Sequence, residues 1–100
     1  MIKSYYAVIF TSTLFADAKG YQEMAQAMEL LAKKQSGFLG IESARNDIGI
    51  TVSYWESETA ILAWKANTDH QMAQKLGREK WYKSYHIRIC KVEREYNYHS

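Results

Sequence analysis

The first part of the chain has the residue pattern of a β-strand. Residues 5–13 are aromatic or β-branched apart from Ala7 and Ser12, which is a composition typical of strands. Apolar side chains occupy both alternating rows, one beginning at Tyr5 and the other at Tyr6. Because alternate residues of a strand point to opposite faces, this pattern predicts a strand that is covered on both sides.

Three further segments have strand patterns, at residues 38–43, 50–55 and 85–96. The first two are separated by Asn46-Asp47-Ile48-Gly49, whose residue types favour a turn. These two segments are therefore expected to form a β-hairpin.

The segments between the strands have helical spacing. In the first, apolar residues recur from Tyr21 to Ala32 on one side of a helix. Asp17 is its expected N-cap, and Ser36-Gly37 is its expected end. In the second, Ser57 is the expected N-cap.

The second helix is expected to be broken. Thr68-Asp69-His70-Gln71 has the spacing of a capping box, in which Gln71 reaches back to Thr68. The helix is then expected to bend at Asn67 and to restart at Thr68. Gly77 is expected to begin a looser segment before the last strand.

The predicted order is β-α-β-β-α-β, which is that of a ferredoxin-like α+β fold with a four-stranded antiparallel sheet and two helices on one face. One hundred residues are enough for a single hydrophobic core, so residues 1–100 are expected to form one domain. The other face of the sheet would leave an apolar row of the first strand uncovered. We therefore expect a homodimer, in which a second copy of the chain covers this sheet face.

Composition narrows the range of partners. The formal net charge is +2 with both signs interspersed, which gives no reason to expect nucleic acid. No apolar run is long enough to span a bilayer, and the first residues lack the features of a signal peptide. Cys90 is the single cysteine, so no internal disulfide can form. We expect a cytoplasmic protein without a membrane partner.

Several stretches carry a resemblance to a known family. They are Tyr54-Trp55-Glu56-Ser57, followed by Ala60, Trp64 and His70; Gly77-Arg78-Glu79-Lys80-Trp81-Tyr82; Ser36-Gly37-Phe38-Leu39-Gly40; and the last strand. In these features the chain resembles the antibiotic biosynthesis monooxygenase (ABM) family of dimeric α+β barrel proteins. The resemblance implies a dimer whose sheets form a barrel, and a small-molecule pocket between helices and sheet. The family includes cofactor-free monooxygenases of aromatic polyketides and haem-degrading enzymes.

The haem-degrading relatives differ from this chain at the iron ligand. They carry a Trp on the second helix, which Trp64 matches, and a haem-ligating His ten residues later, where this chain has Gln74. His70 lies one helical turn before Gln74, so haem binding would require a shifted ligand. Those relatives also have an Asn on the first strand, which Phe10-Thr11-Ser12 does not offer. We expect no cofactor, with haem as the alternative.

Two residues are candidates for catalysis. The neutral imidazole of His70 could accept a phenolic or enolic proton near physiological pH. Alternatively, His70 is a partly exposed helical histidine that hydrogen-bonds Asn67. Arg78 could stabilise a phenolate or carboxylate, or it could only offset the dipole of a helix end.

The candidates for substrate contact are Trp64, Gln74, Trp55 and Tyr85. Trp64 is expected either to stack on a planar ligand or to pack in the core. Tyr54 and Trp55 point to opposite faces of their strand, so at most one of them reaches the helix side. Tyr85 belongs to an aromatic cluster at the start of the last strand, for which core or dimer packing is the alternative.

No metal site is expected. His86 and Cys90 share a strand face, but four residues at about 3.3 Å each place them about 13 Å apart, too far for one zinc ion. Cys90 is expected instead to be a small buried hydrophobic side chain. The sequence has no glycine-rich phosphate loop and no nucleophile elbow, so nucleotide cofactors are not expected.

These observations lead to three hypotheses of function. The first is a cofactor-independent monooxygenase of the ABM type that deprotonates an aromatic or enolisable compound to an anion, which then donates an electron to oxygen. The protein would supply binding, deprotonation and shielding from water. The second is a haem- or small-molecule-binding module without turnover. The third is a structural dimer whose pocket is filled by its own side chains.

Overall fold

A computed structural model of the chain describes residues 4–75 and 77–100, with side chains for all of these except positions 70–78. The elements are β1 (Tyr5–Leu14), α1 (Tyr21–Lys33), β2 (Phe38–Arg45), β3 (Gly49–Trp55), α2 (Glu58–Lys75), α3 (Gly77–Lys80) and β4 (Tyr82–Val92). The predicted β-α-β-β-α-β order is confirmed, with α3 as a short addition before β4. The fold is the predicted ferredoxin-like α+β fold.

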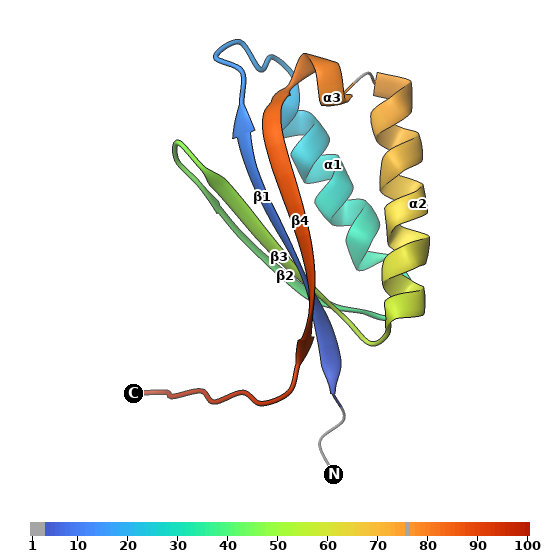
Figure 1. Cartoon of the computed structure of the whole chain (residues 1–100), viewed down its shortest axis with the longest axis vertical. Coiled ribbons are helices and arrows are strands. Elements are labelled where there is room, and N and C mark those ends of the chain that lie inside the picture. Colours follow the sequence, from blue (N-terminus) through green and yellow to red (C-terminus); the bar gives the residue numbers. More distant parts are fainter. Residues whose placement is uncertain (1–3, 76) are drawn as a thin grey trace.

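The four strands form one antiparallel sheet in the order β2-β3-β1-β4. Figure 1 shows α1 and α2 on the same side of this sheet. Trp55 pairs with Tyr6 of β1 and stacks against Trp64 of α2, so the row of β1 that begins at Tyr6 points to the helices. We call this side of the sheet the helix-side face and the opposite side the far face.

The start of α1 differs from the sequence prediction. The helix begins at Tyr21 after Gly20, whose φ is 86°, and no side chain caps it. The prediction of Asp17 as the N-cap is therefore wrong. The Trp81 indole donates a hydrogen bond to the Lys19 carbonyl at 2.7 Å, so a tertiary contact fixes this turn. Gly20 adopts the left-handed conformation there at low cost.

The predicted break in α2 is also wrong, because α2 runs continuously from Glu58 to Lys75. Thr68 does not begin a new helix. Its hydroxyl donates to the Lys65 carbonyl at 2.9 Å within the same helix. The predicted cap at Ser57 is confirmed, since Ser57 Oγ accepts a hydrogen bond from the Ala60 amide at 3.1 Å.

The last strand begins and ends earlier than predicted, at Tyr82 and Val92 instead of residues 85 and 96. Tyr82 pairs with Leu14 of β1, after a register shift next to Thr13. Residues 93–100 have no regular structure, and Figure 1 shows them leading away from the sheet. Within the described residues, no helix has both the length and the apolar character needed to cross a bilayer.

No helix or strand of the described residues covers the far face. Tyr5 and Tyr54 meet there edge to face, with ring centroids 6.0 Å apart. Tyr54 donates a hydrogen bond to the Glu42 carboxylate at 2.8 Å, which raises the pKa of the Tyr54 phenol. Cys90 pairs with Ala7 on this face and is exposed, so the prediction of a buried thiol is wrong for the single chain.

Candidate functional site

One end of the helix-side face is closed by aromatic rings, and we call it the tryptophan end. It consists of Phe38, Trp55 and Trp64. Trp55 stacks against Trp64 at a centroid distance of 5.7 Å, and Phe38 meets Trp55 edge on at 5.5 Å. Trp55 is 0% exposed, and its indole nitrogen donates to Ser53 Oγ at 2.9 Å. The Trp55 indole is therefore dry and has its polar atom satisfied, whereas Phe38 and Trp64 are only half-buried.

The other end is also aromatic but contains hydroxyl groups, and we call it the tyrosine end. It consists of Phe10, Tyr21, Tyr82 and Tyr85. Tyr82 is 8% exposed and lies 5.5 to 5.7 Å from the other three rings. Burial, reinforced by the hydrogen bond and charge of Tyr21, raises the pKa of the Tyr82 phenol far above its ordinary value, although the Arg45 charge acts the other way. Tyr82 therefore remains a neutral hydroxyl.

An apolar row on β4 connects the two ends. Tyr85, Ile87 and Ile89 pair with Ser12, Phe10 and Val8 of β1 and so face the helix side. They are nevertheless 40%, 43% and 50% exposed, because α2 does not close over β4. With about 3.3 Å per residue, the row is about 13 Å long.

A hollow lies where this row approaches α2. It has a volume of about 200 Å³ and is lined by Glu58, Ile61, Leu62 and Ile89. Three of these four side chains are apolar, and they come from two different elements. The hollow between β4 and α2 is therefore mainly apolar, as small-molecule sites usually are.

A larger hollow of about 280 Å³ is lined by Gln26, Glu29, Leu30 and Lys33. All four residues belong to α1, and Glu29 and Lys33 form an ion pair at 3.8 Å. It is a groove between the side chains of one helix, without an aromatic wall. We therefore place the candidate site between β4 and α2, in spite of the smaller volume there.

The predicted substrate-contact residues fall into two groups. Trp55 and Trp64 lie together at the tryptophan end, with Trp55 behind Trp64. Tyr85 lies at the tyrosine end. The β1 partners of Trp55 and Tyr85 are six residues apart, Tyr6 and Ser12, which corresponds to about 20 Å along the strand.

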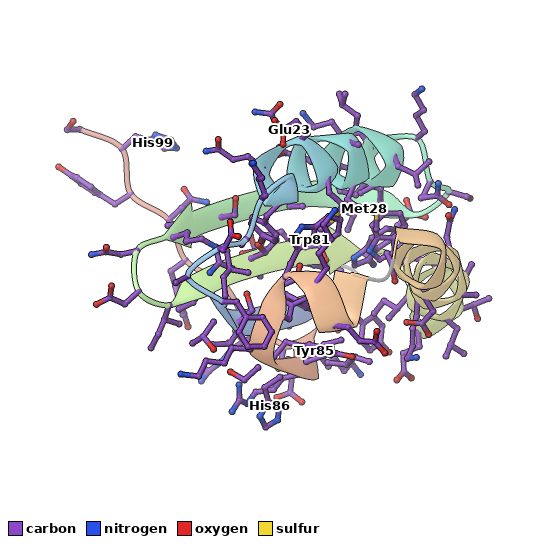
Figure 2. The ribbon with its side chains drawn as sticks, turned by 90° about the horizontal axis from the view of Figure 1, so that it is seen from above. Glu23, Met28, Trp81, Tyr85, His86 and His99 are labelled. Atoms are coloured by element: carbon purple, nitrogen blue, oxygen red, sulfur yellow. The ribbon has the colours of Figure 1, made fainter. Side chains whose placement is uncertain are left out.

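The side chains of His70, Gln74 and Arg78 lie outside the described residues. Their proposed roles therefore stay predictions. The positions of the other two histidines are clear in Figure 2, where His86 and His99 lie at the periphery of the molecule and Trp81 lies near its middle.

A polar cluster beside the tyrosine end was missed by sequence reasoning. Arg45 donates hydrogen bonds to Ser12 Oγ and to the Tyr21 hydroxyl, the latter at 3.3 Å. Its guanidinium also lies 5.1 Å from the centre of the Tyr21 ring. A Cβ atom at Gly49 would overlap this guanidinium. Gly49 was the only residue whose type could have indicated this cluster, and we interpreted it only as a turn residue.

No group of three or more His, Cys, Asp or Glu side chains that could hold a metal ion is present among the described residues. His86 and Cys90 pair with Thr11 and Ala7 and so belong to the far face. No described side chain on the helix-side face is a His or a Cys. A porphyrin bound there would thus depend on His70 for a histidine ligand.

Comparison with known proteins identifies the family. The sequence pattern of the antibiotic biosynthesis monooxygenase family matches residues 13–76. The chain is 50% identical over 93 residues to the uncharacterized protein YqjZ of Bacillus subtilis, an alignment that covers 91% of this chain and 82% of YqjZ.

Solved structures share the fold. A variant of SnoaB, a cofactor-independent oxygenase from Streptomyces nogalater, matches 91% of this chain and 95% of its own with a TM-score of 0.74 and 9% identity. A variant of MhuD with two manganese protoporphyrin IX bound per active site matches 92% of this chain and 98% of its own, with a TM-score of 0.66 and 23% identity. From the match of the family's sequence pattern over residues 13–76, this chain belongs to the antibiotic biosynthesis monooxygenase family.

Proposed function

We propose that this protein is a cofactor-independent monooxygenase that oxidises an aromatic or enolisable small molecule on the helix-side face. The observation that carries the proposal is the open apolar row of Tyr85, Ile87 and Ile89, which faces the protein's own helices and is still accessible. A row that served only as core would be covered by α2. Membership of the family and the fold shared with SnoaB support this proposal.

The proposed reaction balances without an external reductant. An activated CH₂ group of the substrate loses both hydrogens and gains one oxygen atom of O₂, while the second oxygen atom leaves as water. The substrate supplies all the electrons. The protein then needs to bind the substrate, remove a proton and exclude water.

The candidate residues have the following proposed roles. Trp64 stacks on the substrate, with the buried Trp55 holding its ring from behind. His70 accepts the proton, and Arg78 stabilises the resulting anion. Gln74 and Tyr85 contact the substrate.

The proposal is tested with 1,8-dihydroxyanthrone, an enolisable three-ring compound, by oxygen uptake and by the absorbance of the quinone product. Purified protein without added cofactor is expected to accelerate the oxidation, and His70→Ala and Trp64→Phe are each expected to slow it at least tenfold, about 1.4 kcal/mol. His99→Ala, at an exposed position in the segment after β4, is the matched control and should leave the rate unchanged. A rate equal to that in buffer would contradict the proposal.

The second candidate function is binding of haem without turnover. It is favoured by the fold shared with MhuD, which binds manganese protoporphyrin IX, and by the exposed apolar row that a porphyrin plane could cover. The test is a titration with haem followed by the Soret band. A sharp shift that His70→Ala abolishes would support this function, and the absence of a shift would exclude it.

We propose further that the far face is the interface of a homodimer. Ile9 and Val52 pair with each other in the centre of this face, and Ile50 is exposed nearby. A second copy would remove this apolar surface from water. Light scattering coupled to size exclusion should give twice the chain mass at micromolar concentration, and Ile9→Arg should give the monomer. A stable wild-type monomer would contradict the dimer.

A further inference from the structure

The side chain of Arg45 reaches from an edge strand to the middle of the sheet. The register places Arg45, Gly49, Ser12 and Tyr85 in one row across β2, β3, β1 and β4. The guanidinium passes over Gly49, where a Cβ atom would overlap it, and donates to Ser12 on β1. Because neighbouring strands are about 4.8 Å apart, the cation lies one strand away from Tyr85 and the apolar row.

The charge of Arg45 has no carboxylate partner in the part of the chain that the structure describes. The ion pairs there join Glu29 to Lys33 and Lys65 to Asp69. The hydrogen-bond acceptors of Arg45 are neutral: the Ser12 carbonyl at 3.5 Å, the Ser12 hydroxyl and the Tyr21 hydroxyl. These bonds use three of the five N–H groups of a guanidinium, so two donors remain.

The tyrosine pair beside Arg45 also has a donor left over. The rings of Tyr21 and Tyr82 meet edge to face with centroids 5.7 Å apart, and the interaction between their hydroxyls contributes to the raised pKa of Tyr82. Arg45 donates to the Tyr21 hydroxyl and cannot accept, so at most one of the two phenol hydrogens is shared between the two oxygens. No described residue accepts the second hydrogen. Two N–H groups and one O–H group are therefore available around one uncompensated cation.

We infer that Arg45, together with Tyr21 and Tyr82, forms the anion-binding end of the substrate-binding face and holds the oxygen of a bound phenolate or enolate. This inference rests on the proposed function and deepens it. Hydrogen bonds from charged or polarised donors strengthen as the acceptor becomes an anion, so they favour the deprotonated substrate over the neutral one. Arg45 does not remove the proton. It stabilises the anion that remains.

The arrangement also indicates a class of substrate. The apolar row from Ile89 to Tyr85 is about 13 Å long and ends beside the Arg45 cluster. A compound that fits is a fused-ring aromatic with an acidic phenolic or enolic oxygen at one end and an apolar opposite end. The tryptophan end would meet the apolar rings, and the tyrosine end would meet the oxygen.

The test measures the pKa of bound 1,8-dihydroxyanthrone without oxygen, using the longer-wavelength absorbance of its enolate. Wild-type protein is expected to lower this pKa relative to water. Arg45→Gln and Tyr82→Phe are each expected to reduce the ionisation constant of the bound anthrone about tenfold, the effect of one charge-assisted hydrogen bond. Arg45→Lys, which keeps the charge but loses the planar fork, should give an intermediate value. Arg94→Gln, at an exposed position in the segment after β4, is the matched control and should have no effect.

The outcomes separate this inference from the proposed function. If the anthrone binds and its pKa is the same in wild type, Arg45→Gln and Tyr82→Phe, the inference is wrong, while oxidation in air would still support the monooxygenase. If the pKa shift is present but oxygen is not consumed in air, the result supports the anion-binding end and contradicts the proposed monooxygenase activity. Failure of the wild-type protein to bind the anthrone would overturn the inference. If Arg45→Gln does not fold, the pKa of the anthrone bound to Arg45→Lys is compared with that of the anthrone bound to wild type.

Discussion

The two ends of the helix-side face use similar aromatic residues but treat polar atoms differently. At the tryptophan end, Trp55 is fully buried and its N–H group is paired with Ser53. At the tyrosine end, the buried phenol of Tyr82 lies near Arg45, whose charge no carboxylate of the described residues balances. The buried and hydrogen-bonded Trp55 contributes stability, whereas the unused donors of the exposed Arg45 are available to a ligand.

The largest loss in the free energy of unfolding is expected from a substitution at the tryptophan end. Replacing Trp55 with Ala removes a fully buried ring that packs against Phe38 and Trp64, so unfolding should become easier by about 3–5 kcal/mol. Urea denaturation measures this, and Trp55→Phe is a milder variant if the alanine protein does not fold. Trp64→Ala should cost less because Trp64 is only half-buried. An equal or larger loss at Trp64 would contradict the division between the two ends.

A middle-sized effect is expected from Gly49→Ala. The added methyl overlaps the Arg45 guanidinium and must displace it, which should destabilise the protein by about 1–3 kcal/mol. In an Arg45→Gln background the same change should cost much less, because the two changes act on one contact. Gly40→Ala is the matched control, since its Cβ would meet Tyr54 at an ordinary 3.8 Å. If the losses in free energy of unfolding from Gly49→Ala and Arg45→Gln are additive in the double variant, the contact between Arg45 and position 49 does not contribute to stability.

The contrast between the ends also shows what a sequence can predict. Hydrophobic periodicity was enough for the order of the elements, because the buried rows of strands and helices repeat at fixed spacing. The capping signals at Asp17 and Thr68 gave wrong predictions. In the structure α1 begins after Gly20, and α2 continues through Thr68. Such local signals are weak and tertiary packing overrides them.

Only part of the candidate site could be predicted from the sequence. Trp64 and Tyr85 were identified because large aromatic side chains are conspicuous in any sequence. The cluster of Arg45, Ser12 and Tyr21 was not, since its members are 24 and 33 positions apart and meet only through the sheet register. The role of Gly49 as a space for a side chain from another strand has no sequence signal distinct from that of a turn.

The smallest effect at neutral pH is expected from Tyr82→Phe, about 1 kcal/mol for one hydroxyl. Its pH dependence is diagnostic. The pKa of Tyr82 is raised in the folded protein, whereas the unfolded phenol ionises near pH 10. The stability that the neutral phenol gives is therefore complete below pH about 10 and is lost as the pH rises toward the folded pKa.

Urea denaturation at about pH 8 and pH 11 checks this expectation. The stability of the wild-type protein should fall more steeply over this range than that of Tyr82→Phe. Tyr96→Phe is the control, since Tyr96 is exposed in the segment after β4 and its loss should leave the slope unchanged. Equal slopes for wild type and Tyr82→Phe would mean that the Tyr82 phenol is not buried in solution.

The most direct test of the substrate site is a crystal structure with 1,8-dihydroxyanthraquinone, the product expected from the anthrone. The account predicts that its rings lie along Ile87 and Ile89 opposite α2, with one oxygen within hydrogen-bond distance of Tyr21, Tyr82 or Arg45. Density for the ligand on the outer groove of α1 or on the far face, with the β4 row in contact only with protein side chains, would contradict it.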